Sequence, residues 1–525
     1  MKLLYNARIY TFDENQPLAS ALVIDRKHIL ALGESDALRV EFSSAKSQDM
    51  QGGIILPGLT DAHLHLQHYA LSLQKVDCET NTLAECLRRI AERANKTPPG
   101  EWILGHGWNQ NNWDGWPSKA DLDKIAPNNP VYLTAKSLHA GWANSAALKL
   151  ANITANTPHP ENGQIQHDAH GQPTGILLET AMELVGNIVP EPPVDTLAEA
   201  IEQAQPSLWR LGLTGVHDFD RRACFMALQH LHANGRLKLR VNKSVPIELL
   251  PQANELGLRT GFGDDTLWIG SVKAFMDGAL GPHTAAMIQP YEDDPANKGI
   301  LNMDAEELFE QGRLAAEVGL SMAVHAIGDR ANHEVLNAFE QLRRFERDHS
   351  MPPLRHRIEH VQILHPDDLG RLAALDIIAS MQPIHATSDM IMADEYWGER
   401  TKYAYAWKTQ LEAGARLAFG SDAPVESPNP FWGIHAAITR QRGDGFPNPG
   451  GWHPEQRLSM QAAIAGFTTD AAYTAGKEHK LGKLASGYLA DLIVLEDDLF
   501  DMPPSKVRDL RPQATMLGGE WVFQK

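Results

Sequence analysis

Apolar and polar positions follow different patterns at the two ends of the chain and in its middle. Residues 3–10, 21–24 and 490–495 form short runs typical of strands, separated by turn residues. Alternation with a period of two indicates strands with one buried face. Because chain termini often lie close together, we expect residues 1–57 and 481–525 to form one composite β-sandwich domain.

Between these ends, short apolar runs alternate with helical patterns, which indicates parallel strands joined by crossover helices. The runs end near eight positions: His65, Asp218, Pro246, Asp277, His325, Gln362, Pro383 and Asp422. Eight strand–helix units predict an α/β fold, a (β/α)8 TIM barrel that spans residues 58–480.

Residues 66–206 interrupt this rhythm after the first strand. The segment is too long for a loop without structure, so we expect an insertion subdomain that sits over the barrel mouth. Of the twelve tryptophans, those at 102, 108, 113, 116 and 142 fall here. Trp108 and His139 are candidates for a lid over an apolar substrate pocket. Alternatively, the tryptophans form an aromatic cluster that only holds the insertion together.

Charge and composition narrow the range of partners. The formal net charge of −19 argues against binding to a nucleic acid or to an anionic membrane surface. No segment approaches the ~18 uncharged apolar residues of a membrane span, and the start has no unbroken apolar stretch typical of an export signal. We therefore expect a small-molecule substrate as partner.

The cysteines indicate the compartment and the kind of metal ligand. Cys78, Cys86 and Cys224 are an odd number in a long chain, which is no disulfide framework and favours a reducing, cytoplasmic location. None has CxxC spacing, so any metal has to be held by nitrogen and oxygen ligands.

The strongest local signal is Leu-Pro-Gly-Leu-Thr-Asp-Ala-His-Leu-His at 56–65. In a strand, His63 and His65 project to the same side, and two neutral imidazoles at that separation can chelate one cation. A single His-x-His pair is weak evidence, because two ordinary polar histidines give the same pattern.

Four further candidate ligands stand at the C-terminal ends of later apolar runs, where a barrel of this type keeps its active site. They are Lys273, His325, His360 and Asp422. Each could be a polar residue satisfied within the core. Four of them at strand ends favour a metal site.

With these motifs the sequence resembles the amidohydrolase superfamily, in the family 3 branch that includes N-substituted formamide deformylases. The resemblance covers nearly the whole chain. The matching stretches are Pro-Gly-Leu-Thr-Asp-Ala-His-Leu-His (57–65), Lys-Ala-Phe-Met-Asp-Gly-Ala-Leu-Gly (273–281), His-Ala-Ile-Gly-Asp-Arg-Ala (325–331), Arg-Ile-Glu-His (357–360), Gly-Ser-Asp-Ala-Pro-Val (420–425) and Gly-Tyr-Leu-Ala-Asp-Leu-Ile-Val-Leu (487–495).

The resemblance implies a ligand set of six residues for one or two divalent metal ions. His63, His65 and Asp422 would bind a first ion, His325 and His360 a second, and Lys273 would bridge them as N6-carboxylysine. Imidazole and carboxylate ligands favour zinc, although manganese, iron or cobalt would fit. The family often dimerises, so the resemblance also implies a homodimer.

The implied activity is that of a metal-dependent hydrolase for carbon–nitrogen bonds other than peptide bonds. A metal-activated water would attack an amide or formamide-like bond of a small organic molecule. Asp422 would then pass a proton to the leaving nitrogen.

Further polar residues are candidates for substrate contacts or for orienting the imidazoles. They are Asp277, His283, Glu359, Gln382 and His385, and each could instead be ordinary polarity at the barrel mouth.

Three alternatives remain open. Deaminases of the superfamily with one metal usually carry a glutamate three residues after the histidine of the fifth strand, whereas His325 is followed by Ala-Ile-Gly-Asp. A cyclic amide or an ester could also be the substrate. The remote alternative is a non-catalytic scaffold, which usually loses ligands, whereas all six positions are filled here.

Overall fold

The computed structural model describes residues 1–525 apart from 111–112, 114, 137–139 and 161–162. Contacts within the chain divide it into two compact units. The first unit comprises Met1–Tyr69 and Leu197–Lys525, and the second comprises Ala70–Thr196. The second unit falls within the range 66–206 expected for an insertion.

An eight-stranded parallel barrel forms the centre of the first unit, which confirms the predicted TIM-barrel fold. Its neighbours run in the order β21-β20-β19-β18-β17-β16-β15-β8. The strands are β8 (Leu59–Leu64), β15 (Leu213–Asp218), β16 (Arg240–Pro246), β17 (Leu267–Phe275), β18 (Met322–Ala326), β19 (Arg357–His360), β20 (Ile378–Met381) and β21 (Leu417–Phe419). Each ends within three residues of its expected position.

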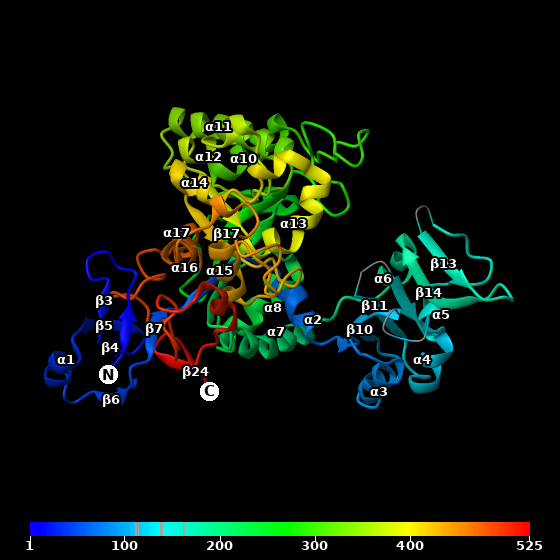
Figure 1. The fold of residues 1–525 in the computed structure, drawn as a ribbon, viewed down its shortest axis with the longest axis horizontal. Coiled ribbons are helices and arrows are strands. Elements are labelled where there is room, and N and C mark those ends of the chain that lie inside the picture. The colour runs from blue at the N-terminus through cyan, green and yellow to red at the C-terminus, as the bar shows by residue number, and fades with distance from the viewer. Residues whose placement is uncertain (111–112, 114, 137–139, 161–162) are drawn as a thin grey trace. The chain divides into compact units, whose positions relative to one another are not determined.

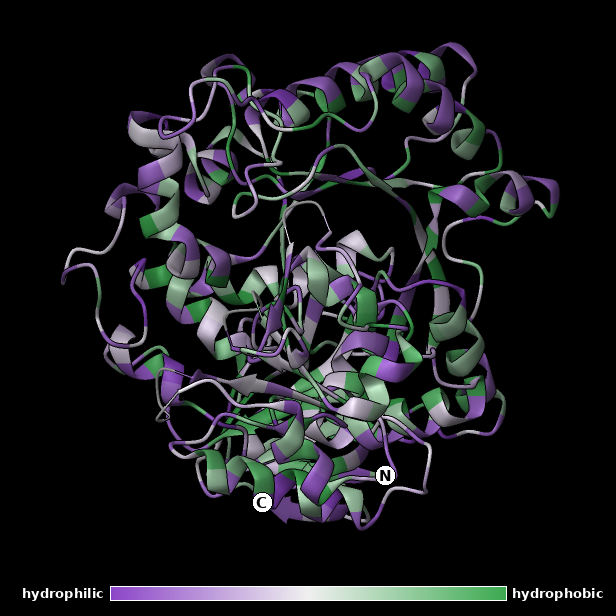
Figure 2. Ribbon diagram, turned by 90° about the vertical axis from the view of Figure 1, so that its right-hand side faces the viewer, coloured by the Kyte–Doolittle hydropathy of each residue, from purple (hydrophilic) through white to green (hydrophobic). Residues whose placement is uncertain are grey.

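Helices follow the strands and pack around them (Figure 1). They are α2 (Leu66–Ser72), α7 (Val194–Trp209), α8 (Arg222–Ala233), α9 (Leu250–Glu255), α10 (Ala305–Glu317), α11 (Asp329–Asp348), α12 (Arg371–Ala374), α13 (Pro383–Trp397), α14 (Trp407–Ala413), α15 (Pro430–Thr439), α16 (Met460–Gly466) and α17 (Thr469–Thr474). Figure 2 shows polar and apolar segments alternating along them, as expected for helices with one face on the strands. Among the described residues, no helix is both long and apolar enough to cross a membrane.

Helix α10 illustrates how the sequence sets these elements. The Asp304 side chain accepts a hydrogen bond from the Glu307 backbone N–H at 2.9 Å and so caps the first turn. Glu306 and Glu307 in that turn complement the positive end of the helix dipole. Leu308 and Ala315 lie on the buried face, which packs against α11.

The two chain ends form the composite β-sandwich that the sequence predicts. One sheet, in the order β24-β23-β22-β7-β2-β3, mixes strands from both ends, and the other has the order β5-β4-β1-β6. The C-terminal strand β22 (Leu492–Leu495) pairs antiparallel with β7 (Ile54–Pro57). The other strands are β1 (Lys2–Tyr5), β2 (Arg8–Tyr10), β3 (Leu18–Ala19), β4 (Ala21–Asp25), β5 (His28–Gly33), β6 (Lys46–Asp49), β23 (Ala514–Leu517) and β24 (Glu520–Gln524), with helix α1 at Ser35–Glu41.

The second unit is built on a mixed sheet of six strands in the order β13-β14-β12-β11-β10-β9. These strands are β9 (Val76–Asp77), β10 (Ile103–Trp108), β11 (Val131–Ala135), β12 (Ala140–Ala143), β13 (Gly163–His167) and β14 (Pro173–Glu179). Helices α3 (Leu83–Ala94), α4 (Lys119–Ile125), α5 (Ser145–Leu150) and α6 (Glu183–Gly186) complete it. Trp108, Trp113 and Trp142 pack together in its core.

Candidate metal centre

All six predicted metal ligands stand at the C-terminal ends of barrel strands. They are His63 on β8 and His65 just beyond it, Lys273 on β17, His325 on β18, His360 on β19, and Asp422 shortly after β21. Parallel strands of a barrel end at one common rim. Residues separated by most of the chain therefore meet at one mouth.

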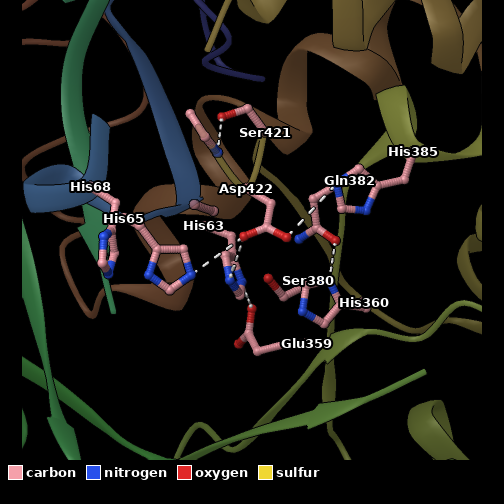
Figure 3. Close-up of polar contacts among 12 residues, drawn as sticks. His63, His65, His68, Glu359, His360, Ser380, Gln382, His385, Ser421 and Asp422 are labelled. Carbon is pink, nitrogen blue, oxygen red and sulfur yellow. Dashed lines mark hydrogen bonds and ion pairs between the residues drawn. The ribbon is translucent and has the colours of Figure 1, made fainter. Parts of the chain in front are cut away.

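His63, His360 and Asp422 form the centre of this cluster. Each offers a ligand atom, and these atoms all lie within 4.8 Å of one another. The Nε2 atoms of His63 and His65 lie 3.4 and 3.5 Å from the same Asp422 oxygen, Oδ1, as Figure 3 shows. Imidazole nitrogens and a carboxylate oxygen at these spacings fit a divalent transition metal.

Lys273 and His325 lie beside this centre. The His325 ring centroid is 4.5 Å from that of His360. The Nζ atom of Lys273 lies 4.7 Å from the ring centroids of both Phe219 and Phe275, and burial lowers the pKa of Lys273 to about 8. In the structure His360 lies with His63 and Asp422, whereas the resemblance assigns it to the second ion. How the six ligands divide between two ions therefore stays a prediction.

One ring nitrogen of each of the four histidines donates a hydrogen bond to an oxygen atom. The Nδ1 atom of His63 donates to Glu359 Oε2 at 2.6 Å, and that of His65 to Asp220 Oδ1 at 3.0 Å. Likewise His360 Nδ1 donates to Gln382 Oε1, and His325 Nε2 to the Gly278 carbonyl, both at 2.8 Å. Such bonds fix the tautomer and leave the other nitrogen of each ring available as a ligand.

The ionisation of these groups also suits metal binding. Burial lowers the pKa of His63 to about 4 and that of His325 to about 3, and it holds the pKa of His360 well below its usual range. These rings are neutral near pH 7, which is the form that binds metal ions. Burial opposes the charged form of His65 as well, but its hydrogen bonds to the carboxylates of Asp220 and Asp422 outweigh this effect and raise its pKa to about 9. A metal ion would displace that proton.

Two residues of the cluster have strained backbone conformations. His360 has φ 76° and Asp422 has φ 61°, in the left-handed region that residues other than glycine rarely adopt. Such strain costs roughly 1–3 kcal/mol per residue, persists where the surroundings enforce it and is concentrated at functional sites.

Four of the seven candidates for substrate contacts or for orienting the imidazoles lie next to the cluster: Glu359 and Gln382, which accept the hydrogen bonds from His63 and His360, and His385 and Asp277. His385 places Nε2 3.8 Å from Asp422 Oδ2, and its ring stacks on that of His360 at 6.1 Å. Asp277 has one oxygen 3.6 Å from His325 Nε2. It also accepts backbone N–H bonds from Ala286, Ile327 and Gly328 at 2.8–3.0 Å, so it fixes the loops around β18.

The other three candidates have different surroundings. His283 binds Asp293 at 2.9 Å and packs against Tyr396. Trp108 is fully buried in the core of the second unit and donates its indole N–H to the Leu133 carbonyl at 3.0 Å. His139 lies outside the described residues. Substrate contacts for these residues stay predictions.

Sequence reasoning missed Asp220, which orients His65, and Asp61, which connects two strands. Asp220 stands two residues beyond the end of β15, so the rule that pointed to the other ligands could have found it. Asp61 precedes His63 by two residues on the same strand. It gives no signal by itself, because its partner Ser421 is remote in the sequence.

Asp61 closes the barrel beside the metal centre. Strands β8 and β21 share no ladder of paired residues, and the one parallel bridge there joins Leu64 to Ala423, four residues beyond the end of β21. The Asp61 carboxylate accepts hydrogen bonds from the backbone N–H groups of His63 and Ser421, both at 3.0 Å, and from the Ser421 hydroxyl at 2.5 Å. These hydrogen bonds join β8, which carries His63, to the segment that carries Asp422.

The Asp61→Ala variant is expected to lose about 3 kcal/mol or more of unfolding free energy. The change leaves two buried N–H groups and a hydroxyl without an acceptor, and each such group costs about 1–3 kcal/mol. Urea titration, with metal content measured in parallel, checks both stability and the ligand geometry.

Asp61→Asn serves as the matched control, because its carbonyl oxygen still accepts both N–H bonds. We expect it to retain most of the stability and the metal content. If the alanine and asparagine variants have the same unfolding free energy and metal content, the hydrogen bonds of Asp61 do not have this role.

A TIM barrel that gathers oriented histidines and an aspartate at its mouth defines the class of metal-dependent hydrolases. The chain belongs to the amidohydrolase family, whose model matches residues 46–523.

Named relatives and solved structures agree with this assignment. YtcJ of Bacillus subtilis, whose name calls it an amidohydrolase, is 33% identical over 530 residues, which cover 98% of each chain. The N-substituted formamide deformylase of Arthrobacter pascens is 28% identical over 555 residues, covering 100% of this chain and 98% of the relative. The crystal structure of an uncharacterised metal-dependent hydrolase from Pyrococcus furiosus superimposes with a TM-score of 0.80 at 33% identity, covering 95% of this chain and all of that one.

Proposed function

We propose that this protein hydrolyses a carbon–nitrogen bond of a small organic molecule, an amide or an N-substituted formamide, with the aid of one or two zinc ions. The observation that carries the proposal is the set of four histidines, each held by an oxygen acceptor, around Asp422. The likeness to an N-substituted formamide deformylase supports the choice of bond. Three free cysteines fit the cytoplasm.

His63, His65, His325, His360 and Asp422 would hold the metal, with carboxylated Lys273 as a bridge. When bound, the metal supplies a water made acidic enough to act as a nucleophile near neutral pH. Pre-oriented ligands of this kind hold a metal in one geometry.

Asp422 is the proton carrier in this proposal. Although burial opposes it, the positive charge that His63 carries at low pH and the hydrogen bond from His65 hold the pKa of Asp422 well below its usual range. The carboxylate is therefore ionised at neutral pH and can accept a proton from water. Returning that proton to the nitrogen lets the amine leave.

Phe275 provides an apolar wall at the mouth. Its side chain is 45% exposed, although it lies against Lys273 and 5.3 Å from the His325 ring. An exposed aromatic ring beside the ligands favours a substrate with an apolar substituent next to the scissile bond.

The proposal favours amide hydrolysis over deamination because Gly328 occupies the position three residues after His325. The next residue, Asp329, begins α11 and accepts a hydrogen bond from the Ile288 backbone at 2.8 Å.

The test is a substrate panel with the purified, metal-bound protein. An N-substituted formamide, the matching acetamide and the matching formate ester are compared by amine or alcohol release. We expect amine release from at least one amide. Ammonia release from amino-substituted heterocycles alone would replace this proposal by deamination, and no turnover of any compound would point to a scaffold.

A further inference from the structure

A cavity lies in the first unit, and none of the predicted metal ligands lines it. It has a volume of about 320 Å³ and opens between α13, α15, the loop 441–444 and the short 3-10 helix η7 (Pro504–Asp509). Ile384, Glu426, Trp432, His435, Arg442 and Arg508 are among its lining residues. This volume suits a small organic ligand.

Among the described residues, two side chains of the wall have neither a hydrogen-bond nor an ion-pair partner. The Arg508 guanidinium lies over the Trp432 ring, 4.3 Å from its centroid, and within the described parts of the chain no residue pairs with it. His435 is only 4% exposed, and no described side chain or backbone group bonds its ring. Arg508 is half-buried, and both side chains line a cavity that solvent reaches, so their N–H groups are free to bond a ligand there.

The other charged groups of the wall are already engaged. Arg442 forms an ion pair with Asp444 at 2.7 Å, and Glu426 accepts a hydrogen bond from the Ser388 hydroxyl. Gly443 leaves room for Arg508, because a Cβ atom there would overlap its guanidinium group. Arg508 is therefore the one cation of the described lining that has no carboxylate partner, in a chain whose net charge is −19.

We propose that this cavity binds a small molecule through an oxyanion, a carboxylate or a phosphate group, held between Arg508 and His435. The guanidinium fork matches two oxygens of either group. Trp432 and Ile384 supply an apolar wall for the rest of the molecule. The oxyanion site does not depend on the proposed amide hydrolysis.

The site borders the metal centre through α13. Ile384 and Thr387 line the cavity, whereas His385 on the same helix lies 3.8 Å from Asp422. Glu426 follows Asp422 by four residues. A ligand in the cavity thus contacts the same two segments that carry Asp422 and its histidine neighbour.

Calorimetric titration of the full-length, metal-bound protein with inorganic phosphate and with benzoate tests the site. We expect saturable binding of at least one probe, and which one binds distinguishes a phosphate from a carboxylate site. Arg508→Gln and His435→Phe should each weaken it about tenfold or more, because each removes a hydrogen bond to a charged group. Lys506→Gln, which removes an exposed charge from the same short helix, should leave it unchanged.

If the variants keep the wild-type melting temperature and metal content, a loss of probe binding is local to the cavity. If neither probe binds at millimolar concentration, the proposal is wrong. Binding that persists in Arg508→Gln at wild-type affinity would place the probe at the metal ions instead and would equally overturn it. A crystal soaked in the probe that binds should show it against Arg508 and His435.

Discussion

Replacing Asp422 by asparagine is expected to lower kcat/KM by about 10²–10⁴-fold, the usual contribution of a positioned acid–base group. The side chain keeps its shape, but it can no longer accept a proton. It also loses the negative charge that faces His63 and His65 at 3.4 and 3.5 Å. The loss should fall on kcat rather than on KM, because substrate contacts are unchanged.

Asp367→Asn is the matched control, since the Asp367 side chain is 88% exposed on the same unit. It should retain wild-type activity. Metal analysis of both variants separates a lost ligand from a lost proton carrier. An Asp422→Asn enzyme with full metal content and activity within threefold of wild type would remove Asp422 from the mechanism.

The barrel could be predicted because its strands have a strong local signal. Buried parallel strands appear as continuous apolar runs, and each ligand stands where such a run stops, as His325 does after Met322–Val324. The ends of β15 and β16 fall on the expected residues, Asp218 and Pro246. Local pattern thus determines where each candidate ligand lies along its strand.

The partners of the ligands could not be predicted in the same way. Glu359 reaches His63 across 296 positions of sequence, and Asp220 reaches His65 across 155. Which carboxylate orients which ring depends on the curvature of the closed barrel, and no periodicity encodes it. Glu359 was a candidate for such a role only because it precedes His360.

The length of the insertion predicts a folded subdomain, but its sequence does not predict which fold it has. Its length excludes a loop, whereas its six-stranded sheet includes short strands such as β9, with two residues. Strands this short carry little periodicity. Its tryptophans satisfy their indole N–H groups locally, as Trp113 does at the Thr80 carbonyl and Trp142 at the Ser118 carbonyl.

Below the metal ligands, buried charges connect the strands of the barrel. Arg357 is 2% exposed and Glu359 is fully buried. They form an ion pair, and Arg357 also donates to His217 Nδ1 at 2.9 Å and to the Ala62 carbonyl at 2.7 Å. Although burial opposes it, the Arg357 charge holds the pKa of Glu359 well below its usual range. Glu359 is then an anion that can accept the His63 N–H.

Arg357→Met is therefore expected to lower the free energy of unfolding by about 3–5 kcal/mol, the usual cost of leaving a buried charge without its partner. Methionine fills much of the space but leaves Glu359 unpaired. Urea titration followed by far-UV circular dichroism measures the change. Arg344→Met is the control, because Arg344 pairs with Glu340 at the surface and is 61% exposed. Loss of such a pair costs about 0–1 kcal/mol.

A double variant, Arg357→Met with Glu359→Leu, tests whether the unpaired charge is the cause. Replacing both partners of a buried pair by apolar residues is often close to neutral, so the double variant should be more stable than Arg357→Met alone. It should nevertheless bind metal more weakly, because His63 loses the acceptor that fixes its tautomer. If the double variant is as unstable as the single one, lost packing rather than the buried charge explains the destabilisation.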